Sequence, residues 1–341
     1  MKKILIIGLG SIGQRHLRNL NTIDKKLKFL AFRRKKIVPT LNDNLEANYK
    51  LSIEKLYNIK TFKTFENSLN QKPYAAFICT PSSFHVKEAI ECLKKNVHVF
   101  IEKPLGSNEK NLDILKKLYS KKKNRIIAMV GFQIKFNPLY IYLKKFIKKN
   151  HKFINRVQIY NGEHINDFHK YEDYKISYAA NKKLGGGVLL TQIHEIDYFM
   201  DLFSNYKIKI VSSLLEKRTK LKLDVEDTFH GKFTLKNKLN EISADVWLDY
   251  YTKPKKKYIK IFLKKTLVIA DFAKKKFILK KKGKIYIKDF EFENNEPFKK
   301  EVIHFLKSIK NKKISNRFDL NNGIKSLEMV LRLKKLSKNS F

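Results

Sequence analysis

The sequence contains few of the residues that would indicate a secreted or membrane-spanning protein. Its 341 residues include only two cysteines, Cys79 and Cys92, which cannot form a disulfide framework and suit a reducing compartment. No apolar run approaches the roughly 18–20 residues that a transmembrane helix needs. The apolar run Ile4–Ile7 is broken by Gly8, so we interpret it as a strand rather than a secretion signal. We therefore expect a cytoplasmic protein without membrane insertion.

Arginine is scarce as well, although the formal net charge is +42. Only nine of the 74 basic residues are arginines, and the lysines are spread over the whole chain. A nucleic-acid interface usually combines forked arginine side chains with lysines. We therefore interpret the charge as solvated surface and expect no specific nucleic-acid partner, only non-specific binding to polyanions at low salt.

The first third of the chain alternates short apolar runs with helical patterns, which is typical of a parallel sheet with crossover helices. Strands are predicted at residues 4–7, 29–32, 75–79, 98–101 and 126–130. Helices are predicted between them at residues 11–20, 84–95 and 108–122. This alternation predicts a doubly wound α/β domain of the Rossmann type.

Beyond residue 153 the pattern changes to alternating apolar and polar residues, which indicates a sheet with one solvated face. Strands are predicted at residues 153–160, 208–215, 228–234, 241–247 and 258–262, and helices at 189–202, 298–309 and 320–336. The second domain is therefore predicted as α+β, with a mostly antiparallel, open-faced sheet and helices. We expect a dinucleotide-binding Rossmann domain at residues 1–123 and a substrate-binding and oligomerisation domain at 124–341, in a homodimer or homotetramer.

A glycine-rich loop follows the first predicted strand and opens the first predicted helix. It reads Gly8-Leu9-Gly10-Ser11-Ile12-Gly13, which has the spacing of the dinucleotide-binding fingerprint. Gly8 permits the tight turn, Gly10 lets the backbone approach a pyrophosphate, and Gly13 lets helix and strand pack closely. The helix start at Ser11 and Ile12 would then present free amide groups to the phosphates. The alternative is a glycine-rich turn in an unrelated α/β domain.

The tip of the second predicted strand bears on the choice of cofactor. NAD enzymes usually end this strand with an acidic residue that binds the ribose 2′-hydroxyl, whereas NADP enzymes place a cation there. Here the strand runs into Arg33-Arg34, with no acidic residue at the tip. We therefore predict NADP as the cofactor, with NAD possible; the alternative is two surface arginines in a very basic chain.

Three further segments resemble motifs of the Gfo/Idh/MocA family of oxidoreductases. They are Cys79-Thr80-Pro81-Ser82-Ser83-Phe84-His85 with the later Glu102-Lys103-Pro104, then Gly131-Phe132-Gln133, and the glycine-led Gly185-Gly186-Gly187 stretch that runs to Asp197. The resemblance implies hydride transfer between nicotinamide and a hydroxyl or carbonyl carbon of a sugar, sugar nucleotide or cyclitol. It also implies a set of cofactor-binding residues: Cys79, Thr80, Pro81, His85, Glu102, Lys103 and Gln133.

Two residues are predicted to carry the chemistry, Lys103 and His194. Lys103 follows a parallel strand at its carboxyl end, where such sheets bind ligands. Partial burial near a cationic nicotinamide would lower its pKa, so that it could stabilise an alkoxide or share its proton. His194 is suited to general acid–base chemistry near neutral pH, and Asp197 lies on the same helix face. The alternatives are one surface lysine among many and a packed helical histidine.

The glycine-led segment departs from the family pattern at one position. Many members of the family have an aspartate four residues before the histidine, where this chain has Leu190. Thr191, Gln192, Glu195 or Asp197 could compensate. A catalytically degenerate, NAD(P)-binding regulatory protein is therefore the alternative to an enzyme. The segment is similar to that of members associated with surface-glycan and nonulosonate sugar clusters.

Aromatic and polar residues that precede or follow the glycines are predicted to bind the substrate. Besides Lys103, His194 and Asp197, these are Phe168, Tyr174, Tyr178 and Thr191. The histidines His164, His169 and His194 lack the compact spacing of a metal site, so no metal is expected.

Overall fold

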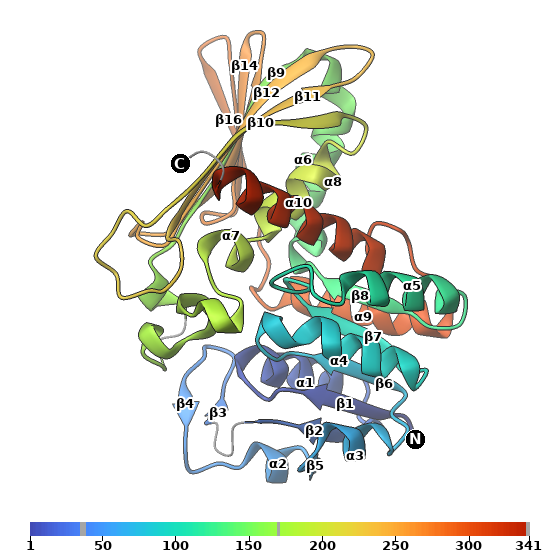
Figure 1. Cartoon of the computed structure of the whole chain (residues 1–341). Helices are drawn as coiled ribbons and strands as arrows, with labels where there is room; N and C mark the ends of the chain where they lie inside the picture. Colours follow the sequence, from blue (N-terminus) through green and yellow to red (C-terminus); the bar gives the residue numbers. More distant parts are fainter. Residues whose placement is uncertain (35–38, 169–170, 339–341) are drawn as a thin grey trace.

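The computed structural model describes residues 1–34, 39–168 and 171–338, and it contains two large sheets (Figure 1). The N-terminal sheet lies at one end of the molecule and the C-terminal sheet at the other, with helices between them (Figure 1). Among the described residues, no helix is both long and apolar enough to cross a bilayer.

The N-terminal sheet has six strands in the order β5-β2-β1-β6-β7-β8, all paired in parallel. Its strands are β1 (Lys3–Ile7), β2 (Lys28–Phe32), β5 (Lys60–Phe62), β6 (Ala75–Ile78), β7 (His98–Glu102) and β8 (Ala128–Gly131). The helices of this part are α1 (Ser11–Ile23), α2 (Ile53–Leu56), α3 (Phe65–Leu69), α4 (Ser82–Lys94) and α5 (Leu112–Lys122), with a small hairpin of β3 (Thr40–Leu41) and β4 (Ala47–Asn48). The strand order reverses between β1 and β6, the position where doubly wound sheets bind ligands. The predicted Rossmann fold is confirmed.

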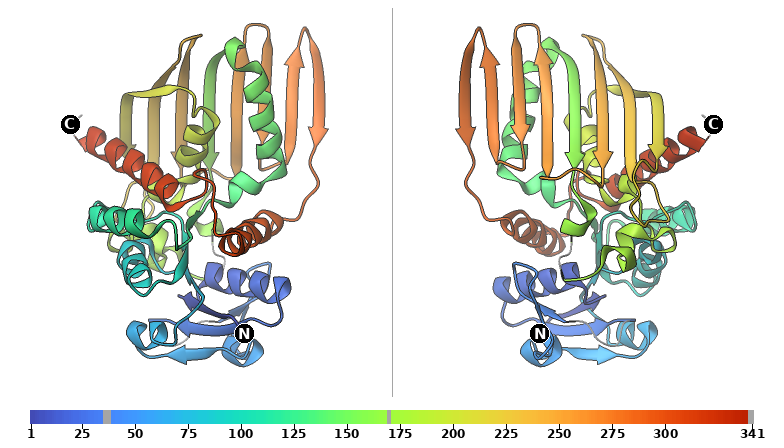
Figure 2. Two further views of the ribbon diagram at one scale, coloured as in Figure 1. Left: turned by 90° about the vertical axis from the view of Figure 1, so that its right-hand side faces the viewer. Right: turned by 90° about the vertical axis from the view of Figure 1, so that its left-hand side faces the viewer.

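The C-terminal sheet has eight strands in the order β10-β11-β12-β9-β13-β14-β15-β16, antiparallel except for the β12/β9 pair. They are β9 (Ile154–Gly162), β10 (Lys207–Glu216), β11 (Thr228–Lys236), β12 (Glu241–Asp249), β13 (Lys256–Leu263), β14 (Thr266–Asp271), β15 (Lys276–Lys281) and β16 (Lys284–Asp289). Helices α6 (Pro138–Asn150), α8 (His194–Leu202) and α10 (Leu320–Lys338) lie on one face, and Figure 2 shows no described helix on the other. The prediction of a mostly antiparallel, open-faced sheet is confirmed.

Short helical segments connect these elements. They are η1 (Gln133–Phe136), η2 (His151–Phe153), η3 (Ile165–Asp167), η4 (Tyr174–Ile176), η5 (Tyr178–Ala180), η6 (Lys182–Leu184) and α7 (Val188–Thr191). The single helix predicted over 189–202 was wrong, because α7 and α8 are separated at Gln192 and Ile193. The Gln192 amide donates a hydrogen bond to the carbonyl of Asp249 at 3.1 Å, which holds this bend against the sheet.

Helix α9 (Glu296–Lys310) returns from the C-terminal part of the chain to cover the N-terminal sheet (Figure 1). Phe305 packs edge-on against Phe77 of β6 and Phe100 of β7, with ring centroids 5.5 and 5.6 Å away. Strand β8 also belongs to this sheet. The predicted division at residue 123 therefore does not describe the packing completely. Two elements that follow residue 123, strand β8 and helix α9, pack with the N-terminal sheet.

Phe305→Ala should destabilise the protein by about 3–5 kcal/mol, because it removes a fully buried ring from between α9 and the sheet. Urea unfolding followed by circular dichroism measures the loss. Phe153→Ala is the matched control, since this ring is 53% exposed and its removal should change the stability by less than about 0.5 kcal/mol. Equal losses in the two variants would contradict the packing described for α9.

Candidate active site between the two sheets

The glycine loop has the geometry that dinucleotide binding requires. Gly8 has a φ of +94°, and its amide donates a hydrogen bond to Phe32 of the neighbouring strand at 2.8 Å. A Cβ on Gly13 would lie 2.0 Å from the Gly8 carbonyl oxygen, so only glycine allows α1 to approach so closely. A Cβ on Gly10 would meet no protein atom within 4 Å. The turn at Gly10, just before the start of α1, therefore has room for an anionic group.

The turn after β6 is joined to the turn after β7 by a buried histidine. The ring nitrogens of His85 lie 2.6 Å from the Thr80 carbonyl and 2.8 Å from the Pro104 carbonyl. The Thr80 hydroxyl donates a hydrogen bond to the buried Glu88 carboxylate at 2.6 Å. These contacts fix the relative positions of the two turns, which carry six of the predicted cofactor-binding residues.

Glu102 lies in a buried acidic group that the sequence analysis missed. Its Oε1 lies 2.6 Å from Nε2 of His16, and Glu301 from α9 places a carboxylate oxygen within 4.8 Å of both. Burial, and then the charge of Glu102, raises the pKa of Glu301 well above its usual range. These are the only three potential metal ligands that meet in the described residues, but their direct His16–Glu102 contact is that of a hydrogen bond.

Lys103 connects the N-terminal sheet to the glycine-led segment of the second domain. Its Nζ donates a hydrogen bond to the Thr191 carbonyl at 2.9 Å. Burial lowers the pKa of Lys103, and the charges of three carboxylates, Glu102, Glu195 and Glu163, oppose this effect. Nearby, the Ser82 hydroxyl donates to the Gly185 carbonyl at 3.2 Å. Motifs that lie about a hundred residues apart in sequence therefore meet here.

His194 is the first residue of α8 and is 7% exposed. Its ring packs edge-on against Phe132, with centroids 5.8 Å apart. Burial lowers the pKa of His194 well below its usual value, and the positive charges of Lys103, Lys257 and Lys135 lower it further. A neutral imidazole beside a lysine ammonium can accept a proton from a hydroxyl group that the lysine holds.

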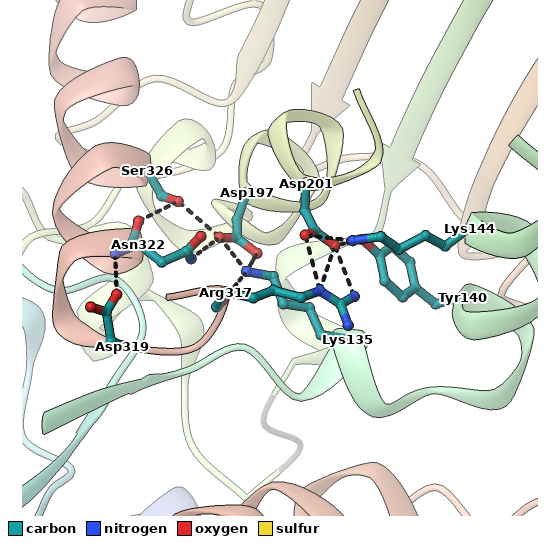
Figure 3. Close-up of polar contacts among 9 residues, drawn as sticks. All are labelled: Lys135, Tyr140, Lys144, Asp197, Asp201, Arg317, Asp319, Asn322 and Ser326. Carbon is teal, nitrogen blue, oxygen red and sulfur yellow. Dashed lines mark hydrogen bonds and ion pairs between the residues drawn. The ribbon is translucent and has the colours of Figure 1, made fainter. Parts of the chain in front are cut away.

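Asp197 lies in a network of polar contacts with residues of η1 and α10 (Figure 3). It forms an ion pair with Lys135 of η1 at 3.0 Å and accepts hydrogen bonds from Asn322 and Ser326 of α10, both at 2.8 Å. The side chain is 1% exposed. The predicted substrate contact of Asp197 therefore has no support in this arrangement, since its carboxylate is taken up by the protein.

One turn further along α8, Asp201 joins the same region to helix α6 (Figure 3). It accepts hydrogen bonds from Arg317 at 2.8 Å, from Lys144 at 2.7 Å and from the Tyr140 hydroxyl. Burial alone would raise the pKa of Asp201, but the hydrogen bonds from Arg317, Lys144 and Tyr140 lower it below its usual range. Two aspartates on one face of α8 thus fix the helix to η1 and α10 through Asp197 and to α6 and Arg317 through Asp201.

Comparison with known proteins identifies the family. The description "Oxidoreductase family, NAD-binding Rossmann fold" matches residues 2–132. Residues 2–132 therefore match the Gfo/Idh/MocA family of oxidoreductases. Myo-inositol 2-dehydrogenase from Thermotoga maritima is 31% identical over 149 residues, which are 43% of this chain and 40% of that protein. The matched segment therefore spans less than half of that relative.

Solved structures of this family share the fold over the whole chain. Myo-inositol 2-dehydrogenase from Lactobacillus plantarum superposes with a TM-score of 0.77 at 18% identity and covers 99% of this chain and 98% of its own. The WlbA dehydrogenase from Bordetella pertussis, in complex with NADH and UDP-GlcNAcA, has a TM-score of 0.74 at 16% identity and covers 100% and 97%. The two-domain Gfo/Idh/MocA fold is confirmed from end to end.

The two arginines on which the NADP prediction rests both form ion pairs within the chain. Arg33 pairs with Glu54 at 2.7 Å, and Arg34 pairs with the buried Glu88 at 2.8 Å and lies over the Phe84 ring. A 2′-phosphate would have to share these guanidinium groups with the two carboxylates. The match of residues 2–132 shows an NAD-binding Rossmann fold, and the choice of NADP stays a prediction.

The predicted substrate residues occupy different surroundings. Tyr178 is half-buried, and burial, followed by the negative charge of Glu102, raises its pKa. Phe168 packs edge-on against Tyr250 at 5.5 Å, and the Tyr174 hydroxyl accepts a hydrogen bond from the Lys222 amide at 3.3 Å. Gln133 lies at the start of η1, immediately after β8, and His169 lies outside the described residues.

At position 190, where many Gfo/Idh/MocA members have an aspartate, this chain has a leucine in apolar surroundings. Leu190 is 2% exposed and belongs to the hydrophobic core of the second domain. Four residues could substitute for the missing aspartate. The Thr191 carbonyl accepts a hydrogen bond from Lys103, the Gln192 side chain donates one to the Asp249 carbonyl, and Asp197 forms an ion pair with Lys135. Glu195 is the fourth of these residues.

Gly10→Ala and Gly13→Ala separate the two requirements of the loop. Gly13→Ala should cost about 1–3 kcal/mol or more, because its Cβ meets the Gly8 carbonyl. Gly10→Ala should cost less than about 1 kcal/mol, yet weaken dinucleotide binding at least about tenfold by occupying the space of the pyrophosphate. Urea unfolding and fluorescence titration with the reduced dinucleotide measure these effects. Unchanged affinity in Gly10→Ala would place the dinucleotide elsewhere.

Proposed function

We propose that this protein is an NAD(P)-dependent dehydrogenase or reductase that acts on a hydroxyl or carbonyl carbon of a sugar, sugar nucleotide or cyclitol. The observation that carries the proposal is that Lys103, at the carboxyl end of β7, donates a hydrogen bond to the Thr191 carbonyl, three residues before His194, and that its charge acts on the His194 ring. The names of the relatives, which act on inositol or bind a nucleotide sugar, support this substrate class.

The chain's own residues would handle the substrate oxygen and its proton. Bound nicotinamide would supply the hydride acceptor, and the electron pair of the carbinol C–H bond would leave with that hydride. Neutral His194 would take the hydroxyl proton while Lys103 donates a hydrogen bond to the oxygen as the C=O bond forms. Tyr178, which lies near Glu102, would close the site on the substrate side. Carbonyl reduction would run through the same steps in reverse.

We further propose that the open face of the C-terminal sheet joins copies of the chain into a homodimer or homotetramer. This face carries half-buried aromatic side chains, among them Trp247 of β12 and Tyr258 of β13, and no described helix covers it. Both cysteines are buried and unpaired, which suits the cytoplasm.

Turnover should be detected at 340 nm with at least one member of a panel of cyclitols, polyols and nucleotide sugars. Lys103→Ala should then lose at least about 100-fold in kcat while binding the reduced dinucleotide nearly as the parent does, because its ammonium group is needed at the reacting oxygen. The surface variant Lys116→Ala is the control for the loss of a lysine. Retained dinucleotide binding without turnover on any substrate would instead support a catalytically degenerate, regulatory protein.

NADP should bind more tightly than NAD, because Arg33 and Arg34 stand at the tip of β2 where a 2′-phosphate would lie. Arg33→Ala should weaken NADP binding about tenfold and leave the affinity for NAD nearly unchanged, since it removes one charge-assisted contact. Fluorescence titration of both reduced dinucleotides measures this, with Arg218→Ala as the control for lost charge. A parent protein that prefers NAD would refute the NADP assignment.

A further inference from the structure

A buried ion pair lies directly beside the proposed acid–base centre. Glu195 follows His194 in the first turn of α8, and its side chain is 0% exposed. Its Oε1 lies 2.7 Å from Nζ of Lys257 on β13, whose side chain is 15% exposed. Replacement of such a pair by apolar residues is often neutral or stabilising, because burying two charges costs more than their attraction returns. Stability alone therefore does not account for the pair.

The pair lies close to both residues of the centre, because Glu195 is the chain neighbour of His194, and Lys103 donates its hydrogen bond to the Thr191 carbonyl, four residues before Glu195. The carboxylate of Glu195 acts on Lys103 from across the junction of the two domains, in the direction that keeps its ammonium form. Lys257 acts on the His194 ring in the direction that keeps it neutral. Glu195 thus favours the protonated form of Lys103, and Lys257 favours the neutral form of His194. These are the charge states that the proposed mechanism requires.

Other charged groups face the centre from the elements around it. Glu102 of β7 and Glu163, which follows β9, act on Lys103, and Lys135 of η1 acts on His194. Each has a partner of its own: Glu102 contacts His16, Glu163 pairs with Lys255 at 2.7 Å, and Lys135 pairs with Asp197. Further along α8, Asp201 forms ion pairs with Lys144 and Arg317.

We propose that Glu195 and Lys257 are positioning residues that set the protonation of the centre, Lys257 keeping His194 ready to accept a proton and Glu195 keeping Lys103 ready to donate a hydrogen bond. This inference rests on the proposed function and deepens it. It also assigns Glu195 as the carboxylate that serves the centre, since Leu190 carries none. The pair acts through Lys103 and His194 and needs no contact with the substrate.

Two variants test the two halves of the proposal. In Lys257→Met the pKa of His194 should rise by about half a unit or more, because a nearby cation is lost. The acid limb of the kcat/KM profile should then move to higher pH. In Glu195→Gln the pKa of Lys103 should fall by a similar amount, which moves the alkaline limb to lower pH. A purely structural role of the pair would move neither limb in these opposite directions.

His194 can be followed without any substrate, by an NMR titration of the imidazole in the full-length protein. Lys257→Arg keeps the charge and should restore the parent titration. Lys260→Met is the matched control, because Lys260 lies on the same strand, three residues from Lys257, so its side chain points to the other face of the sheet. Dinucleotide affinity should stay within about twofold of the parent in every variant, since neither Glu195 nor Lys257 is among the predicted cofactor-binding residues.

Lys257→Met leaves Glu195 buried without its partner, which could unfold the protein. The double variant Glu195→Gln/Lys257→Met removes both charges and keeps the volume, and it should narrow the pH profile from both sides. An unchanged His194 titration in a folded Lys257→Met or double variant would overturn the inference, whatever the enzyme does. Absence of dinucleotide binding or turnover in the parent protein would instead refute the proposed function, so the two failures are distinguishable.

Discussion

The geometry of the site depends on the buried ion pair between Lys135 and Asp197. Lys135 follows the last strand of the N-terminal sheet, Asp197 lies in the first turn and a half of α8, and α10 closes the pair through Asn322 and Ser326 (Figure 3). Removing either charge would leave the other buried and unpaired, at a cost of about 3–5 kcal/mol. Because α8 is fixed in this way, His194 at its start is positioned near Lys103 of the N-terminal domain. The proposed chemistry therefore rests on a contact that touches no ligand.

The fold could be predicted where the pattern is local. Strands buried on both faces, such as Ile4–Ile7, and the glycine loop after them have short-range signatures, and the Rossmann sheet is as predicted. Strands β14 to β16 were missed. In β14 the residues Leu267–Ala270 form a short apolar run without alternation in the sequence. Strands β15 and β16 are rich in lysine, and every residue of β16 is exposed, so neither has a clear apolar face in the sequence. The packing of α9 against the N-terminal sheet could not be predicted either, because the sequence of an amphipathic helix does not indicate which sheet the helix covers.

The candidate site was predictable only in part, for the same reason. Sequence spacing placed His194 and Asp197 on one helix face, but the partner of each depends on elements far away in the chain: Lys103 for the first and Lys135 for the second. The contact of His16 with Glu102 joins residues 86 positions apart, and it has no signature within either segment. Leu190 occupies the position where an acidic residue was expected. Only the folded chain shows which other carboxylate could take over the role of that residue.

Helix α9 has a consequence for how the protein is made. A ribosome delivers the six strands of the N-terminal sheet long before it delivers Glu296–Lys310, so Phe77 and Phe100 remain without their covering ring during most of translation. The first domain of the nascent chain is thus an unfinished layer with an exposed aromatic surface. Its completion waits for nearly the last segment of the chain, and the cofactor domain matures together with the whole molecule rather than ahead of it.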